Sequence, residues 1–247
     1  MSDNSYTLMY AAIVCFVCSF MLSLFAVGLQ PAQQKAAKID LYRNILSVFE
    51  LGGTEMADTE VETTFQESIR EIVIDTEGNV FEGQAFSDVP EKQRCELLYT
   101  KFPNNPEDCK LSVFSKVSDG EVAAYAIPLE GKGLWSTLYG YLALEKDGST
   151  IMGITFYKHG ETPGLGAEIS QPWFANNFKG KKLLDETGAL TSVKVFKGKA
   201  KDSSLPEDHV VDGISGATIT ADGVTDLLKH CAQVFDPFLS KIRKAGA

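Results

Sequence analysis

The segment from Leu8 to Leu29 constrains this chain more than any other. It is almost wholly apolar, and no charged residue occurs between Asn4 and Gln34. At a rise of about 1.5 Å per residue, a helix of this length crosses the roughly 30 Å hydrocarbon core of a bilayer. In lipid, a single segment satisfies its backbone polar groups only as a helix. We predict a short tail over residues 1–7 and a transmembrane helix over residues 8–29.

A cleaved secretory signal is the alternative for this segment, and it fits less well. No Lys or Arg precedes the apolar run, and no small-x-small cleavage site follows it. The run is also longer than the apolar core of an ordinary signal peptide. We therefore expect a retained anchor.

The basic residues around the span indicate an orientation. Lys35, Lys38 and Arg43 follow the span, whereas nothing basic precedes it. By the positive-inside rule, this count places the large domain in the cytoplasm.

The acidic character of the chain limits its partners. With 33 Asp and Glu against 23 Lys and Arg, the net charge is −10. Nucleic acid is excluded as an expected partner, because phosphate binding requires clustered basic residues. The three histidines, His159, His209 and His230, are widely spaced and lack other ligands at metal-binding spacing. We predict no metal site.

Four of the five cysteines bear on chemistry. Cys15 and Cys18 share a face of the predicted span, where small packing residues are the favoured interpretation and a redox or metal role stays open. Cys95 and Cys109 lie in the middle of the chain, and an oxidising compartment would allow a disulfide between them.

Residues 30–115 are predicted to form a membrane-proximal helix and the first part of a soluble domain. Apolar residues at helical spacing predict a helix over residues 36–49, after a break near Pro31 and ending at Gly52-Gly53. Residues 69–75 alternate as a strand does. Residues 84–112 are rich in turn residues, with a short helix expected around residues 91–99.

The rest of the soluble part, residues 116–247, is richer in strand patterns. Aromatic and β-branched residues predict strands over residues 121–129, 137–145, 150–157 and 191–196. A hairpin turn is expected at residues 146–148, a short helix at residues 172–178, and a terminal helix from about Ala221 that is interrupted near Pro237. The predicted fold class is α+β: one antiparallel-sheet domain with flanking helices, following the transmembrane helix.

The first chemical motif is the run Asp212-Gly213-Ile214-Ser215-Gly216-Ala217-Thr218, which leads into the terminal helix. Small residues before a helix N-terminus let a ligand approach free backbone N–H groups at the positive end of the helix dipole. A simple capped turn, with Thr218 or Thr220 as the N-cap, is the alternative.

The second motif is a glycine-rich loop that follows a predicted strand. It reads His159-Gly160-Glu161-Thr162-Pro163-Gly164-Leu165-Gly166-Ala167-Glu168, and an earlier loop reads Gly131-Lys132-Gly133-Leu134-Trp135. The Gly-Lys-Ser/Thr of a P-loop and the three-glycine spacing of a Rossmann fingerprint are both missing. Without further information, both loops would be taken as turns.

The first motif resembles the recognition sequence of the flavin transferase that joins FMN, through its phosphate, to a threonine hydroxyl. Every fixed position of Asp-Gly-x-Ser-Gly-Ala-Thr is present, and the acceptor position falls on Thr218. Thr220 lies two residues beyond and does not match. A threonine hydroxyl is a poor nucleophile without an activating base or metal, which the transferase would supply.

With the anchor and the two glycine loops, nearly the whole chain resembles the C subunit of the sodium-translocating NADH:quinone oxidoreductase. The resemblance implies an FMN-binding domain over residues 116–247 that relays single electrons within a complex that oxidises NADH, reduces quinone and pumps sodium. The implied partners are the other subunits and, during maturation, the flavin transferase. It also implies a single-pass protein of the bacterial inner membrane with its large domain outside the cytoplasm. This contradicts the positive-inside count, and we follow the family, because a cytoplasmic domain could not meet the transferase.

The resemblance also suggests residues that flank the flavin beyond the covalent link. Leu134, Trp135 and Leu165 could form apolar walls beside the ring, although a plain core role is equally compatible with Trp135. The residues expected to offer hydrogen bonds or close backbone approach are Thr162, Gly164, Gly166, Asp212, Ser215, Gly216 and Ala217. No catalytic residue is predicted, and the chain alone is not expected to turn over NADH.

Two other functions compete with this interpretation. The G subunit of the ferredoxin:NAD⁺ oxidoreductase (Rnf) complex shares the anchor and the flavin motif, but the length of the region before Gly131 favours the sodium-pump protein. A membrane-anchored binding or assembly module without redox function would use residues 215–218 only as an anion-binding cap. A hydrolase has no supporting Ser/His/Asp or Cys/His context.

Overall fold

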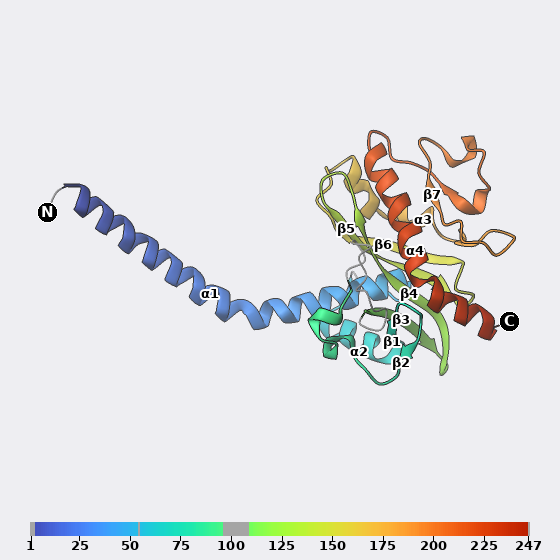
Figure 1. Ribbon diagram of the computed structural model, residues 1–247, viewed down its shortest axis with the longest axis horizontal. Coiled ribbons are helices and arrows are strands. Elements are labelled where there is room, and N and C mark those ends of the chain that lie inside the picture. The colour runs from blue at the N-terminus through green and yellow to red at the C-terminus, as the bar shows by residue number, and fades with distance from the viewer. Residues whose placement is uncertain (1–2, 54, 96–108, 247) are drawn as a thin grey trace. The chain divides into compact units, whose positions relative to one another are not determined.

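The computed structural model describes residues 3–53, 55–95 and 109–246 (Figure 1). The chain divides into two compact units, Met1–Leu41 and Tyr42–Ala247, and each is described by itself. The first helix, α1 (Asp3–Val48), begins in the first unit and ends in the second.

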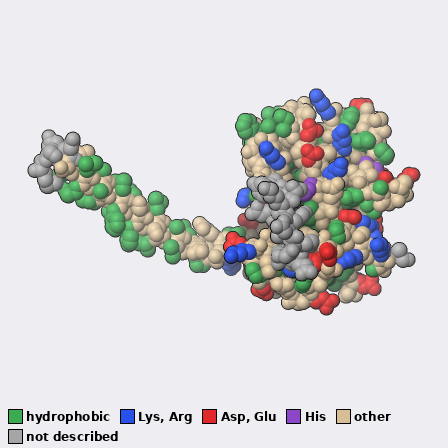
Figure 2. Space-filling model, viewed as in Figure 1, with side chains coloured by type: hydrophobic (Ala, Val, Ile, Leu, Met, Phe, Trp, Pro, Cys, Tyr) green, Lys and Arg blue, Asp and Glu red, His purple; other side chains and the backbone are tan. Residues whose placement is uncertain are grey.

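The first unit is the apolar part of α1. Its large hydrophobic side chains, from Tyr6 to Leu29, are exposed along the helix (Figure 2). By length and composition this helix could cross a membrane. The break that we predicted near Pro31 is wrong, because α1 is continuous through this residue. A proline removes one backbone hydrogen bond and bends a helix, and it need not end it.

The second unit is built on one six-stranded antiparallel sheet, which confirms the predicted fold class. The strand order is β2-β1-β3-β4-β5-β6. The strands are β1 (Ile69–Asp75), β2 (Val80–Phe81), β3 (Lys110–Ser118), β4 (Glu121–Lys132), β5 (Thr137–Glu145) and β6 (Ile151–Lys158).

Helices cover both faces of this sheet, so its central strands are buried on both sides. The long C-terminal helix α4 (Thr218–Gly246) packs against β4 on one face, through residues such as Leu227 and Cys231. On the other face lie the end of α1 and helix α2 (Asp58–Ser68). There the Tyr42 ring stacks on Phe65, with centroids 3.7 Å apart, and Phe65 meets Phe114 of β3 edge-on.

The C-terminal helix differs from its prediction in two respects. It starts at Thr218 rather than near Ala221, and it continues through Pro237 without the expected interruption. Its buried stripe is the one that the sequence indicates, and it forms the centre of the hydrophobic core with the strands: Val224, Leu227, Leu228, Cys231, Phe235, Phe238 and Leu239.

Smaller elements complete the second unit. They are helix α3 (Pro172–Asn176), a parallel pair of strands β7 (Lys194–Val195) and β8 (Val210–Val211), and the 3₁₀ turns η1 (Phe86–Asp88), η2 (Glu91–Gln93), η4 (Gly166–Ser170), η5 (Ala200–Asp202) and η6 (Glu207–His209). Of the strand predicted over residues 191–196, only the two residues of β7 form a strand, because β8 pairs with it over two residues. Of the helix predicted around residues 91–99, only the first turn is helical, and residues 96–99 lie outside the described part of the chain.

Strand β3 and helix α2 are among the elements that were missed from the sequence. The turn-rich assignment of residues 84–112 overlaps the start of β3, a central strand with consecutive buried residues such as Val113 and Phe114, so its alternation is weak. Helix α2 buries only Val61 and Phe65, and its acidic sequence gives little periodic signal.

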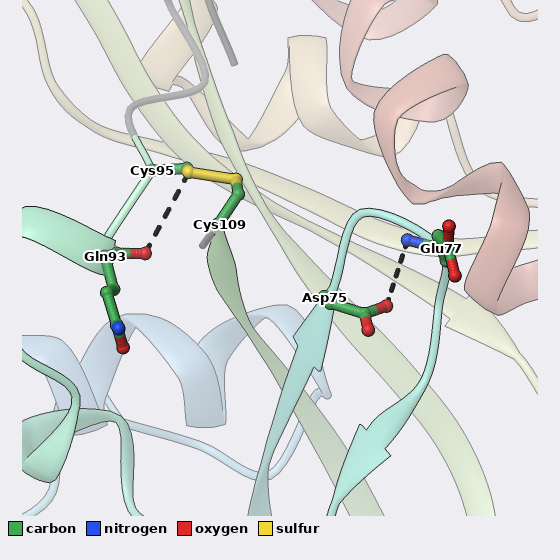
Figure 3. The surroundings of a disulfide bond; sticks show 5 residues. All are labelled: Asp75, Glu77, Gln93, Cys95 and Cys109. Atoms are coloured by element: carbon green, nitrogen blue, oxygen red, sulfur yellow. Dashed lines mark hydrogen bonds between the residues drawn. A yellow bond between two sulfur atoms is a disulfide. The ribbon is translucent and has the colours of Figure 1, made fainter. Parts of the chain in front are cut away.

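The two mid-chain cysteines form a disulfide, which the sequence left open (Figure 3). Their Cα atoms lie 5.4 Å apart, and Cys109 is fully buried beside the first residue of β3. Figure 3 also shows the turn after β1, where the Asp75 carboxylate accepts a hydrogen bond from the backbone N–H of Glu77. Cys15, Cys18 and Cys231 are free thiols.

Candidate functional site

Three segments that are far apart in the sequence meet where β4 ends and β6 ends. They are the loop of residues 133–136 between β4 and β5, the loop of residues 159–166 after β6, and the first turn of α4. The link between them is the side chain of Glu161, which is 5% exposed.

The Glu161 carboxylate accepts four hydrogen bonds. Oε1 accepts from the backbone N–H groups of Trp135, at 2.9 Å, and Ser136, at 3.4 Å. Oε2 accepts from the backbone N–H of Leu134 at 3.3 Å and from the hydroxyl of Thr220, in α4, at 2.6 Å. The carboxylate therefore joins the 133–136 loop to the first turn of α4.

These bonds keep the buried carboxylate ionised. Burial alone would raise the pKa of Glu161, because it removes the charge from water. The hydrogen bonds from Thr220, Trp135, Ser136 and Leu134 act in the opposite direction, and the pKa ends below its ordinary value. The site thus contains a fixed negative charge at neutral pH.

Glycines allow the three segments to approach this closely. A Cβ atom on Gly133 would lie 2.6 Å from Oε1 of Glu161, and one on Gly166 would lie 2.8 Å from Oε2. A Cβ on Gly223 of α4 would lie 2.4 Å from the backbone oxygen of Lys132 at the end of β4. Any larger residue at these positions would force the loops or the helix apart.

Thr218 occupies the exposed first position of α4. The carbonyl of Ala217 accepts the first helical hydrogen bond, from Ala221 N–H at 2.9 Å, so Ala217 is the N-cap rather than either threonine. The N–H groups of residues 218–220 precede the first intrahelical donor and are available to an anion. Ser215 and Gly216 form the turn before the helix, with Gly216 at φ +75° and its missing Cβ 2.9 Å from Leu165 Cδ2.

The two threonines of this turn have opposite environments. Thr218 is exposed, so its hydroxyl can be reached from outside. Thr220 is 1% exposed and its hydroxyl is bonded to Glu161. Of the two, only Thr218 is accessible for modification.

Large apolar side chains on these segments point outward. Leu134, Trp135, Leu165 and Ile219 are 42%, 70%, 41% and 59% exposed. Trp135 is therefore not a core tryptophan, the alternative considered from the sequence. Exposed apolar groups gathered at one place are typical of a ligand or partner surface.

Other predicted site residues have mainly backbone or structural roles. The Thr162 carbonyl accepts hydrogen bonds from the N–H groups of Leu165 and Ala167, both at 3.1 Å, which shapes the turn around Gly164. The Asp212 carboxylate accepts hydrogen bonds from Lys199 Nζ at 2.8 Å and from Ala200 N–H at 2.7 Å. Both bonds lower the pKa of Asp212, and the bond from Lys199 has the larger effect. Asp212 therefore anchors the motif to the preceding loop.

These features fit a flavin mononucleotide. Its phosphate needs an anion site, which the N–H groups at the start of α4 provide, and the Gly216 turn leaves room for close approach. Its ring needs an apolar surface, which the exposed side chains of the two loops provide. The fold and site thus define a flavin-binding domain, and residues 133–233 match the model of the family described as "FMN-binding domain".

Relatives of known identity narrow this class. The chain is 35% identical to the C subunit of the Na(+)-translocating NADH-quinone reductase of Pseudomonas aeruginosa, over 99% of this chain and 98% of that protein. It is 36% identical to the protein of the same name from Vibrio alginolyticus, over 92% of this chain and 90% of the relative.

Solved structures agree. The crystal structure of the protein of this name from Parabacteroides distasonis superposes with a TM-score of 0.70 at 34% identity, covering 86% of this chain and 97% of that one. The crystal structure of Shewanella oneidensis NqrC superposes with a TM-score of 0.67 at 28% identity, covering 85% of this chain and 99% of that one. The chain belongs to the NqrC family, the C subunits of the Na⁺-translocating NADH-quinone reductase, which is an oxidoreductase, and not to the Rnf alternative.

Three participants in the site were missed from the sequence: Glu161, Thr220 and Ile219. Glu161 opens the Glu-Thr-Pro-Gly-Leu-Gly run, and this position was the only available signal. Its role depends on donors 25 to 59 residues away, which no local pattern reveals.

Proposed function

We propose that this chain is the electron-relay subunit of a sodium-pumping NADH:quinone reductase, with FMN attached by a phosphoester bond to Thr218. The single observation that supports this attachment point most directly is the contrast between the two threonines of α4. Thr218 presents an exposed hydroxyl at the helix N-terminus, whereas Thr220 is buried and bonded.

The residues of the site have separate tasks in this proposal. Backbone N–H groups at the start of α4 hold the phosphate, and Leu134, Trp135 and Leu165 shield the ring from water. Thr162 and Gly164 supply polar groups or room at its edge, and Gly166 admits the Glu161 carboxylate behind them. When bound, the flavin supplies one-electron transfer, and the protein supplies position and electrostatics.

Attachment requires an external enzyme. The Thr218 oxygen bonds to the phosphorus of the FMN half of FAD, the pyrophosphate bond breaks, AMP leaves, and the hydroxyl loses its proton. A threonine hydroxyl is a poor nucleophile at neutral pH, so the flavin transferase must supply the activating base or metal.

The large domain lies on the extracytoplasmic side in this proposal. The Cys95–Cys109 disulfide supports that side, because disulfides persist in oxidising compartments and are rare in the cytoplasm. The apolar part of α1 would anchor the chain in the inner membrane beside the other subunits.

The test is ultraviolet fluorescence of the denatured full-length chain on a gel, after co-expression with a flavin transferase. We expect a fluorescent wild type and a dark Thr218→Val variant. Thr59→Val is the matched control, because Thr59 is also an exposed threonine in the first turn of a helix, and this variant should stay fluorescent. A dark wild type with an active transferase would leave the anchored non-redox module as the better function.

A further inference from the structure

We propose that Glu161 is a positioning residue of the flavin site: its carboxylate holds the 134–136 loop against the first turn of α4 and so sets Trp135 relative to Thr218. This inference rests on the proposed function, and it adds a residue that forms no part of the attachment motif. Glu161 would act through the segments that it joins rather than by touching the reacting atoms.

The hydrogen bonds support this role because of where their donors lie. Three donors are consecutive backbone N–H groups of the loop that carries Leu134 and Trp135. The fourth is the hydroxyl of Thr220, two residues after Thr218 on the same helical turn. One side chain therefore fixes the proposed wall of the flavin pocket and the proposed attachment point at once.

The chemistry of the four donors requires a carboxylate. All four face the two oxygens of Glu161, and an ionised carboxylate has acceptor sites for each of them. A glutamine would turn its NH₂ group toward the backbone N–H of Leu134 or Trp135. At least one backbone donor would then face another donor and lose its acceptor. An aspartate is one methylene shorter and could not span the same distance to both segments.

The packing leaves the carboxylate no alternative place. A Cβ on Gly133 or Gly166 would approach its oxygens to within 2.6 and 2.8 Å, so both glycines are needed to admit it. The backbone N–H of Glu161 is itself held by His159 Nδ1, at 3.4 Å. This buried, fully bonded arrangement makes the link between loop and helix rigid.

The charge gives Glu161 a second effect that a purely structural residue would lack. Its carboxylate is a buried negative charge beside the turn that carries Thr218. A nearby negative charge disfavours adding an electron, so its removal should raise the reduction potential of a flavin bound there.

The first arm of the test uses the full chain in detergent without flavin, produced without the transferase. We compare hydrogen exchange at the backbone amides of Leu134, Trp135 and Ser136 in wild type, Glu161→Gln and Glu168→Gln. Glu168 is the matched control, because it lies just beyond the 159–166 loop and its carboxylate instead accepts a hydrogen bond from the indole N–H of Trp173. We expect these amides to exchange at least about tenfold faster in E161Q, given the loss of charge-assisted bonds, and to be unchanged in E168Q.

The second arm measures attachment and potential after co-expression with the transferase. E161Q should acquire covalent flavin at least about tenfold more slowly than E168Q, as expected for a misplaced reacting group, and its flavin should have a higher midpoint potential. The proposal would be overturned by any one of three results in E161Q. These are amide exchange at the wild-type rate, a rate of flavin attachment within about twofold of E168Q, or an unchanged midpoint potential of the flavin.

Two controls keep the result interpretable. If E161Q does not fold, Thr220→Val takes its place, because it removes one of the four bonds without changing the side-chain shape. This variant should exchange the three loop amides faster and acquire flavin more slowly, each by a few-fold. Wild-type exchange and attachment in this variant would overturn the proposal. If the wild type acquires no flavin, the proposed function fails, while the exchange arm still decides whether Glu161 holds the loop.

Discussion

The two ends of strands β5 and β6 are held together in opposite ways. At one end, the hairpin after β5 is closed by Asp147, whose carboxylate accepts from Ser149 N–H, Thr150 N–H and the Thr150 hydroxyl. At the other end, Glu161 accepts from residues 25 to 59 positions away. The Asp147 bonds lie within the turn itself, whereas the Glu161 bonds form only when three distant segments meet.

The difference teaches where function lies in this fold. At the hairpin end, the Asp147 carboxylate bonds to residues of its own four-residue turn, and this end serves to turn the chain. The Glu161 end carries exposed Leu134, Trp135 and Leu165, which cost free energy in water unless something covers them. A buried long-range carboxylate holds this unfavourable surface in place, as is typical of a prepared binding site.

Matched acid-to-amide variants test this difference most strongly. Glu161→Gln should lower the free energy of unfolding by about 3 kcal/mol, because buried charge-assisted bonds are lost and a donor is left opposed. Asp147→Asn should lower the free energy of unfolding by less than about 1 kcal/mol, because the side chain at this position is exposed and can bond to water instead. Urea unfolding in detergent, followed by tryptophan fluorescence, measures both. Equal losses would remove the distinction between the two ends.

Matched glycine-to-alanine variants come next. Gly223→Ala should lower the free energy of unfolding by about 2 kcal/mol net, because the new Cβ would lie 2.4 Å from the carbonyl oxygen of Lys132. This clash outweighs the higher helix propensity of alanine. Gly148→Ala at the hairpin should cost about 1 kcal/mol, since its φ of +63° is strained for alanine while its nearest neighbour would lie at an ordinary contact distance of 3.5 Å. The same unfolding curves rank the two, and a costlier G148A would contradict the close approach of α4 to β4.

Matched threonine-to-valine variants should show a smaller effect. Thr220→Val removes a buried hydroxyl that donates to Glu161, and we expect a loss of about 1 kcal/mol. Thr150→Val removes a donor to an exposed carboxylate and should cost about half as much. Thermal melting of the two proteins at one pH gives the comparison, and a reversed order would argue against the buried link.

The pH dependence should give the smallest effect. Because the pKa of Glu161 is lower in the folded chain than its ordinary 4.5, its carboxylate stabilises the fold above pH 4.5. That contribution is lost as the pH falls through the folded pKa, so the gap in stability between wild type and E161Q should narrow below pH 4.5. Unfolding curves recorded from neutral pH down to about pH 4 measure the gap. A gap that widens on acidification would show that Glu161 is protonated in the folded chain.

The sequence predicted the parts of this molecule that local patterns encode. The long apolar helix, the hairpin at Lys146-Asp147-Gly148 and the stripe of α4 each have a signal within a short window. The motif that ends at Thr218 was likewise readable, as was its position before a helix.

The features that were not predicted depend less on local sequence patterns. Helices α1 and α4 continue through Pro31 and Pro237, because a proline removes one backbone hydrogen bond and bends a helix without having to end it. Strand β3 lacks alternation because both of its faces are buried. The role of Glu161 required the meeting of three distant segments, and the exposure of Trp135 required knowing which side of the loop the core leaves open.

The central claim is that FMN is bonded to Thr218, and mass spectrometry of the tryptic peptide 202–229 tests it most directly. The full chain, matured with the flavin transferase, should yield this peptide heavier by one FMN minus one water. Fragment ions should place the added mass on Thr218 and leave Thr220 and Thr225 unmodified. An unmodified peptide, or the added mass on Thr220 or Thr225, would contradict the assignment of Thr218 as the attachment point.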